Sequence, residues 1–301
     1  MDGVFYWILN MSILGSATGA LLFCLRFIPR FPKFGLYALW GAAAVRLCIP
    51  AAFSSGFSLL GLLKGLGLRC VTLMQAGNVS VTMANSVQAA ESYFPVVYKE
   101  DSLAPLFAAA AIVWACVAGA MILLAIALYI LSARHIKPAP LKDGYCLSGS
   151  VDSPAVYGII RPRILIPAAY AHSPGLKCIL AHERVHVKRR DNLWRLIALF
   201  IGCAHWFNPL VWVFIKVFFS DMETACDEKA LSGCAENERR SYARTLVACA
   251  SKGGLTSPFS AGPVKSRVMH ILTYRKMTLC SACVFAALAL AALWVLLTNP
   301  A

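Results

Sequence analysis

Charged side chains are scarce in this chain, and acidic ones are the scarcest. Asp, Glu, Lys and Arg make up 14% of the 301 residues, with 14 acidic against 28 basic side chains. Hydrophobic residues reach 59% and the mean hydropathy is +0.67. This composition excludes an ordinary soluble domain. The basic excess forms no stripe interleaved with aromatic residues, so direct nucleic-acid binding is not expected.

Two features of secreted proteins are also missing. The first apolar stretch lacks a preceding basic segment and an A-x-A site, so a cleaved signal peptide is not expected. The 12 cysteines show no spacing typical of a disulfide framework, and only Cys70 falls within a predicted external loop. We therefore expect reduced, mostly buried thiols.

The apolar residues are concentrated in blocks of the length that crosses a bilayer as a helix, about 20 residues. Four such spans are predicted, at residues 4–25, 34–53, 106–131 and 279–297. The short loop "RFIPRFPK" between the first two has three basic residues and no acid, so the positive-inside rule makes it cytoplasmic. Both chain termini are then outside. The segment 132–278, with 21 Lys and Arg against 10 Asp and Glu, is then inside.

The chain is thus predicted to be a membrane protein with five parts. They are two transmembrane helices with a basic cytoplasmic loop (1–53), an extracellular loop (54–104), a third transmembrane helix (105–131), a cytoplasmic domain (132–278), and a fourth transmembrane helix with a short external tail (279–301).

A zinc hydrolase motif lies in the cytoplasmic segment, within "LAHERVHVKRRDN" at residues 180–192. On a helix, His182 and His186 share one face, so both can present a ring nitrogen to one Zn²⁺ ion. Glu183 is rotated about one hundred degrees from His182, which suits a general base acting on a water molecule. The alternative is a pair of solvated histidines, but the apolar residues around the motif favour a partly buried helix.

A third ligand is expected in "DMETACDEKAL", because a catalytic zinc site has three protein ligands and one open position. Glu223 can complete the site, and Asp227, four residues later, can accept a proton from a ligand histidine. His205 is a competing ligand. It stands in "CAHWFNPL", where a turn role is preferred.

The apolar stretch 193–219 decides whether this site can form. As one helix it would be about 40 Å long and would carry Glu223 across the bilayer. Asn208 and Pro209 divide it into two pieces, each too short to cross about 30 Å. We therefore expect a helical hairpin that returns Glu223 to the histidines, at a cytoplasmic site close to the membrane.

A β-hairpin is predicted before the zinc helix, in "VDSPAVYGIIRPRILIP" at residues 151–167. Zinc peptidases commonly bind the peptide as an added strand. We assign that substrate edge to this hairpin, with the residues Tyr157, Gly158, Ile160 and Ile164.

Taken in order, these motifs resemble the BlaR/MecR-type membrane zinc metallopeptidases, the antirepressor family of inducible β-lactam resistance. The resemblance covers nearly the whole chain. It implies four spans in the bacterial plasma membrane and a cytoplasmic, mainly α (α+β), gluzincin-like domain. The site is then formed by His182, His186 and Glu223 on Zn²⁺, with Glu183 as base and Asp227 behind the ligands. The expected partners are the lipid bilayer and a cytoplasmic transcriptional repressor, which the protein cleaves. Whether the protein forms a homodimer stays open.

The chain departs from the family pattern after the fourth span. Drug-sensing members have an external penicillin-binding domain after the fourth span, whereas this chain stops at Ala301 and has no S-x-x-K or K-T-G sequence. Either the chain is a truncated or sensorless relative, or the sensor is another molecule, and we do not expect this polypeptide itself to recognise β-lactams. The Gly/Ser/Pro-rich segment 251–266 is either a passive linker or a site of self-cleavage.

Two other functions remain open. Heat-shock and prenyl-protein endopeptidases share H-E-x-x-H and a later E-x-x-x-D, but the Asn-Pro break and the order of the spans favour the antirepressor type. The other alternative is a signalling membrane protein whose site is catalytically inert. The sequence has candidate metal ligands, a candidate general base and a supporting carboxylate, which argues against an inert site.

Overall fold

The computed structural model describes residues 2–28, 31–49, 104–135, 141–142, 144–149, 151, 153–171, 176–231, 236–252, 264–273 and 279–297. Nearly all of the predicted external loop 54–104, with Cys70, lies outside the described residues, as does most of the segment 251–266.

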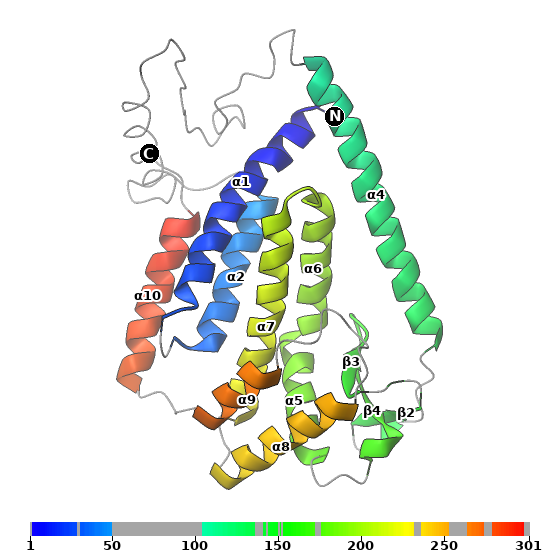
Figure 1. Ribbon diagram of the computed structural model, residues 1–301, viewed down its shortest axis with the longest axis vertical. Helices are drawn as coiled ribbons and strands as arrows, with labels where there is room; N and C mark the ends of the chain where they lie inside the picture. The colour runs from blue at the N-terminus through cyan, green and yellow to red at the C-terminus, as the bar shows by residue number, and fades with distance from the viewer. Residues whose placement is uncertain are drawn as a thin grey trace.

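Four helices lie at the predicted spans. In Figure 1 the first, second and last of them pack side by side, whereas the third meets the first near its N-terminal end and then diverges from it. They are α1 (Asp2–Leu25), α2 (Lys33–Cys48), α4 (Ala104–His135) and α10 (Leu279–Leu297). The described residues contain two apolar helices long enough to cross a membrane, Val4–Leu25 and Pro105–Arg134. The apolar part of α10, Cys283–Val295, is shorter. The 16 residues of α2 extend for about 24 Å. Four crossings therefore stay a prediction.

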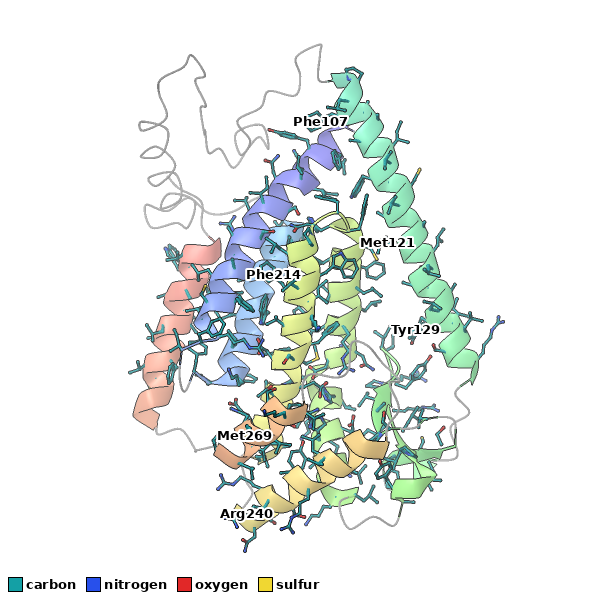
Figure 2. The ribbon with its side chains drawn as sticks, in the orientation of Figure 1. Phe107, Met121, Tyr129, Phe214, Arg240 and Met269 are labelled. Atoms are coloured by element: carbon teal, nitrogen blue, oxygen red, sulfur yellow. The ribbon has the colours of Figure 1, made fainter. Side chains whose placement is uncertain are left out.

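Helix α4 exposes large apolar side chains along much of its length, including Leu123 at 69% and Leu124 at 60%. Such a continuous exposed apolar surface is unfavourable in water and suits contact with lipid. Its lower end reaches the sheet, where Tyr129, labelled in Figure 2, stacks on Tyr157 with the ring centroids 5.9 Å apart.

A small sheet of four strands lies below the long helices. Its strands are β1 (Leu141–Lys142), β2 (Tyr145–Ser148), β3 (Ala155–Tyr157) and β4 (Arg163–Pro167), in the order β1-β2-β4-β3. β3 and β4 are antiparallel, pairing Val156 with Ile164, so the predicted hairpin is present. Gly158 has φ +96°, and a Cβ there would lie 2.9 Å from the carbonyl oxygen of Arg161. Only glycine therefore fits this turn.

Helix α5 (Leu176–Arg189) follows the sheet and a short 3₁₀ turn, η2 (Ala168–Tyr170). Ile164 and Ile166 of β4 are buried in one cluster with Ile179 of α5, so the sheet supports the helix that carries the zinc motif. The remaining helices are α6 (Asp191–Ala204), α7 (Pro209–Leu231), α8 (Glu236–Lys252) and α9 (Val264–Thr273).

Helices α6 and α7 form the hairpin that the Asn-Pro pair predicts (Figure 1). Asn208 accepts a 2.9 Å hydrogen bond from the backbone N–H of Leu210, and Pro209 is the first residue of α7. This is a favourable start for a helix, because proline has no N–H to leave unpaired. At its far end, α7 returns to the level of α5.

The tip of this hairpin is held by polar contacts with three neighbouring helices. The amide of Asn208 donates to the hydroxyls of Ser12 and Ser16 on α1, each at 2.7 Å. Trp114 of α4 donates to the carbonyl of Ala204 at 2.7 Å, and His205 contacts the carbonyl of Leu47 on α2 at 3.1 Å. Polar groups in an apolar layer require such partners. His205 therefore has the turn role that was preferred for it, and the tip reaches about the middle of α1.

Candidate metal centre

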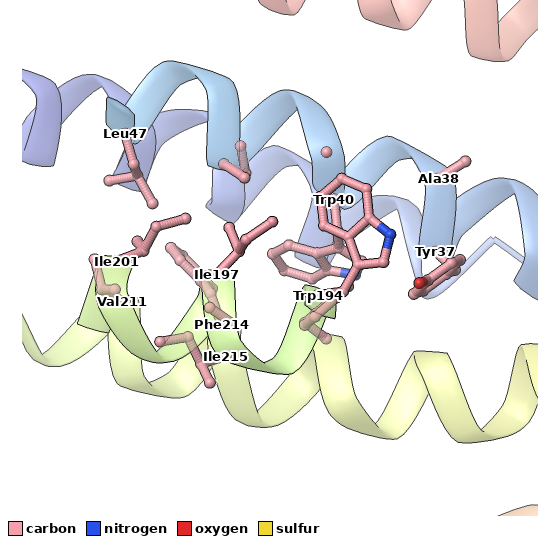
Figure 3. A pocket seen from close by; sticks show the side chains of 15 residues that line it. Tyr37, Ala38, Trp40, Leu47, Trp194, Ile197, Ile201, Val211, Phe214 and Ile215 are labelled. Atoms are coloured by element: carbon pink, nitrogen blue, oxygen red, sulfur yellow. The ribbon is translucent and has the colours of Figure 1, made fainter. Parts of the chain in front are cut away.

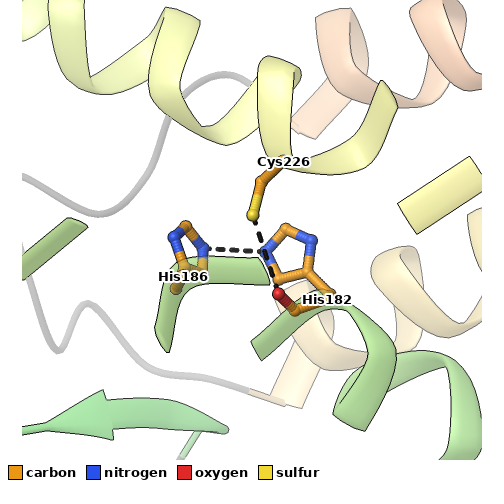
Figure 4. Close-up of side chains that lie close together, drawn as sticks. All are labelled: His182, His186 and Cys226. Carbon is orange, nitrogen blue, oxygen red and sulfur yellow. Dashed lines mark hydrogen bonds between the residues drawn. The ribbon is translucent and has the colours of Figure 1, made fainter. Parts of the chain in front are cut away.

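His182 and His186 occupy the buried face of α5, one helical turn apart. Their Nε2 atoms lie 3.1 Å from one another, and the residues are 7% and 5% exposed. Figure 4 shows both rings directed toward the same point below α7. The i, i+4 spacing of the motif thus converges two ring nitrogens in a region from which water is largely excluded.

The other nitrogen of each ring faces a carboxylate. Nδ1 of His182 lies 3.1 Å from Oδ1 of Asp227 and 2.8 Å from the hydroxyl of Tyr242. Nδ1 of His186 lies 2.6 Å from Oδ2 of Asp191. A carboxylate at Nδ1 favours the proton there and leaves the Nε2 lone pair free. Two such lone pairs 3.1 Å apart fit a metal ion between them.

Asp191 reaches His186 because of an unusual turn between α5 and α6. Arg190 adopts the left-handed conformation, with φ 55° and ψ 43°, at a cost of roughly 1–2 kcal/mol for a residue with a side chain. Arg189 donates to the same carboxylate from Nε at 3.1 Å and from Nη2 at 2.6 Å. This role of Asp191 was not predicted from the sequence, where its only local signal is a position five residues after His186.

Glu223 comes to the histidine pair from the facing helix α7. Its Oε2 is 3.5 Å from Nε2 of His182, and its Oε1 is 3.7 Å from Nε2 of His186. Two arginines share the carboxylate, Arg195 at 2.8 Å and Arg267 at 3.3 Å. Burial alone raises the pKa of Glu223, but the charge and hydrogen bonds of the histidines, together with Arg267, outweigh it and hold the pKa well below its usual range.

Cys226 is a second candidate ligand that the sequence analysis missed. It lies one helical turn after Glu223, and with His182 and His186 it forms a group whose ligand atoms all lie within 4.8 Å of one another. Figure 4 shows the thiol above the two rings, and its sulfur contacts the carbonyl of His182 at 3.6 Å. The i, i+3 spacing from Glu223 was the available signal.

Asp227 is completely buried behind His182 and is held by a bidentate ion pair. Arg267 of α9 donates to it from Nε and Nη2, both at 2.8 Å, and Tyr242 of α8 donates at 2.6 Å. Burial raises the pKa of Asp227, but these bonds and the charge of Arg267 outweigh it and lower the pKa.

The protonation of His182 follows from the same contacts. Burial lowers its pKa, but Cys226, Asp227 and Glu223 outweigh burial and raise the pKa to about 10. The pocket therefore favours a positive charge at the position where the two rings meet, which a proton on the ring supplies in the metal-free protein and a bound cation would supply in its place.

The predicted base, Glu183, lies next to His182 on α5 and is buried, with 8% of its surface exposed. Its burial agrees with a place inside the site rather than on a solvated surface of the helix. Its role as a general base remains a proposal.

The predicted substrate edge is only partly where we expected it. Tyr157 ends the edge strand β3 and Gly158 follows it, but Ile164 lies in β4, between β2 and β3. The assignment of Ile164 to the edge is therefore wrong, because an inner strand has no free side to pair with a peptide. Ile160 is 92% exposed in the β3–β4 turn rather than in a strand.

One side chain of α6 already occupies part of the β3 edge. The amide of Asn192 donates to the carbonyls of Val156 at 2.9 Å and Gly158 at 3.0 Å. Alternate residues of a strand direct their backbone groups to the same side. The free side of β3 therefore faces the first turn of α6, beside the metal centre.

Comparison with known proteins assigns the chain to a family. It is 32% identical over 124 residues to "Regulatory protein BlaR1" of Bacillus licheniformis, and the match covers 40% of this chain and 21% of that protein. It is 23% identical over 141 residues to the "Methicillin resistance mecR1 protein" of Staphylococcus aureus, covering 43% and 24%. The chain thus spans about a quarter or less of the length of these curated relatives. The family model described as BlaR1 peptidase M56 matches residues 6–271. The chain therefore belongs to the M56 metallopeptidase family, of the BlaR/MecR type.

Proposed function

We propose that the protein is a zinc-dependent endopeptidase of a membrane signal-transduction system. The observation that carries this proposal is the convergence of two buried Nε2 atoms beside Glu223, with each opposite Nδ1 held by a carboxylate. Zinc-binding histidines are typically oriented in this way. Membership of the M56 family supports the peptidase activity.

His182, His186 and Glu223 would hold the ion. Two histidines and one glutamate are a known ligand set of catalytic zinc in peptidases. Glu223 faces both Nε2 atoms, at 3.5 and 3.7 Å, and Cys226, whose sulfur lies within 4.8 Å of both rings, is the alternative third ligand. When bound, zinc would polarise the carbonyl of the scissile peptide bond as a Lewis acid.

The other residues of the centre would position groups and move protons. Glu183 would take a proton from the attacking water and pass it to the leaving amine. Asp227 and Asp191 would keep the imidazoles of the two ligands in one tautomer and orientation. The free side of β3, the strand that ends at Tyr157 before Gly158, would align the substrate as an added strand through the N–H of Val156.

We propose a cytoplasmic transcriptional repressor as the substrate. This proposal rests on the regulatory names of the curated relatives and on the family resemblance. The proposed topology has four spans in the bacterial plasma membrane, with both termini outside and the peptidase domain inside. Cleavage of the chain itself within 251–266 and formation of a homodimer are further proposals.

The test uses full-length protein reconstituted in bilayers with zinc, together with a candidate transcriptional repressor from the same bacterium. Wild type should cut the repressor, and Glu183→Gln should bind equal zinc but cut at least about a hundredfold more slowly. Mass spectrometry of the chain itself checks self-cleavage, because a new terminus within 251–266 should appear in wild type alone. Equal cleavage by both proteins would identify a contaminating protease and reject the proposal.

A further inference from the structure

An apolar cavity of about 300 Å³ lies between α2 and the α6–α7 hairpin. Figure 3 shows Trp40 and Leu47 of α2 on one wall, opposite apolar side chains of α6 and α7 such as Ile197 and Phe214. The polar atoms of Tyr37 and Trp40 are already engaged at 3.0 Å, by Asp191 and Asp221 respectively. The cavity therefore offers hydrocarbon to a ligand, and a ligand that fits it is apolar.

The length of the cavity matches one leaflet of a bilayer. Its α2 wall runs from Tyr37 to Leu47, which corresponds to about 15 Å of helix. The hydrocarbon core of a bilayer is about 30 Å thick, so 15 Å is half of it. The inner end lies near the hairpin tip, which Asn208 fixes to Ser12 and Ser16 in the middle of α1. In the proposed four-span topology, the cavity thus extends from the cytoplasmic boundary to about the centre of the membrane.

The cytoplasmic end of the cavity is open and basic. Ala38 is exposed and Trp194 is 38% exposed, so the cavity opens between α2 and α6. The guanidinium of Arg189 lies 4.4 Å from the ring centre of Tyr37, and its two chain neighbours, Lys188 in the last turn of α5 and Arg190 directly after the helix, are exposed. Cations beside an apolar slot at the cytoplasmic boundary suit the phosphate of an anionic lipid.

We propose that this cavity binds one acyl chain of an anionic phospholipid from the cytoplasmic leaflet, with its phosphate beside Lys188 and Arg190. The chain would lie against Tyr37, whose hydroxyl bonds to Asp191, the carboxylate behind His186. The bound lipid would thus stabilise the position of α2 relative to the metal centre. Lipid binding itself does not depend on the proposed peptidase activity.

Photo-crosslinking tests the site in the full-length protein. Nanodiscs of phosphatidylcholine would contain a small fraction of phosphatidylglycerol with a diazirine on its acyl chain, and labelled peptides would be located by mass spectrometry. We expect label on cavity residues of α2 and α6 above the level on the exposed face of α4. Ala44→Phe, which fills the cavity from a half-buried wall position, should reduce that label to the α4 level. Ala120→Phe, on the exposed face of α4, is the matched control and should change nothing.

A second arm tests the headgroup without altering the cavity. Arg190→Gln should remove the preference for phosphatidylglycerol over a phosphatidylcholine probe, whereas Arg244→Gln, an exposed arginine on α8, should keep it. Gel filtration and zinc content confirm that each variant is folded.

Three results would overturn the proposal. One is cavity label that does not exceed the α4 level, which would indicate only bulk lipid. Another is label that survives Ala44→Phe. The third is a lipid-free dimer in native mass spectrometry of protein that carries no photo-crosslinked label. A second copy of the chain would then cover the cavity.

Discussion

The hydroxyl of Tyr37 donates a 3.0 Å hydrogen bond to Oδ1 of Asp191, whose Oδ2 lies 2.6 Å from His186. Tyr37 belongs to α2, so only the carboxylate of Asp191 separates this predicted transmembrane helix from a proposed zinc ligand. The same helix contacts α7, because Glu228 accepts bonds from the backbone N–H groups of Lys33 and Phe34, both at 3.2 Å. Helix α2 thus touches both sides of the metal centre, and its displacement would change the geometry of the ligands.

Replacing Asp191, the carboxylate between Tyr37 and His186, should weaken metal binding. Asp191→Asn keeps the shape of the side chain but removes the charge that favours the proton on Nδ1 of His186, so zinc affinity should fall about 10–100-fold. Tyr37→Phe should give a smaller fall in the same direction. Competition with a chromophoric chelator measures both. Unchanged affinity in Asp191→Asn would show that this carboxylate does not support a ligand.

The third ligand can be identified with cobalt in place of zinc. Glu223→Ala should lose the metal, because it removes one of three protein ligands, and Cys226→Ser should retain it. Cobalt-substituted wild type should lack the intense near-ultraviolet band of a thiolate–cobalt bond. If that band is present and disappears in Cys226→Ser, the ligand is the cysteine and our assignment of Glu223 is wrong.

The buried ion pair between Arg267 and Asp227 should make a large contribution to stability. Arg267→Met leaves a carboxylate that is completely buried without its cation, which typically costs about 3–5 kcal/mol. Thermal unfolding of the metal-free protein in detergent measures the change. Arg244→Met, at an exposed position on α8, is the control and should shift the midpoint little. Equal shifts in the two variants would contradict the prediction.

Proline substitutions can locate the substrate edge. The carbonyl of Val156 points to the free side of β3, so its N–H does too, and Val156→Pro removes that donor without breaking the β3–β4 ladder. We expect a higher KM for a peptide substrate with zinc content unchanged. Ile160→Pro, in the exposed turn, serves as the matched control and should have little effect. Normal KM in Val156→Pro would remove β3 from the substrate site.

The position of the hairpin tip predicts the membrane topology of the catalytic segment. Because α6 and α7 turn back near the middle of α1, a reporter fused after Leu231 should read cytoplasmic, as should one fused after Lys33. A fusion within 60–100 should read external. An external signal after Leu231 would mean that residues 193–219 cross the bilayer, which would separate Glu223 from the histidines.

The local pattern of the sequence was enough for several features. Apolar blocks mark the positions of the long helices, since burial in an apolar medium depends on composition over about 20 residues. The spacing of His182 and His186 places two nitrogens on one face, because the period of a helix is 3.6 residues. Asn208 and Pro209 mark the hairpin turn, because proline starts a helix but interrupts its interior.

Only the tertiary structure decided which distant groups meet. Asp191 faces His186 because Arg190 adopts a left-handed conformation, which no sequence periodicity predicts. Cys226 joins the histidines, and Ile164 lies in an inner strand rather than at the edge, because helix packing and strand order involve segments far apart in the chain. The cavity between α2 and the α6–α7 hairpin arises in the same way. It exists only where three helices, each apolar on its own, leave space that their side chains do not fill.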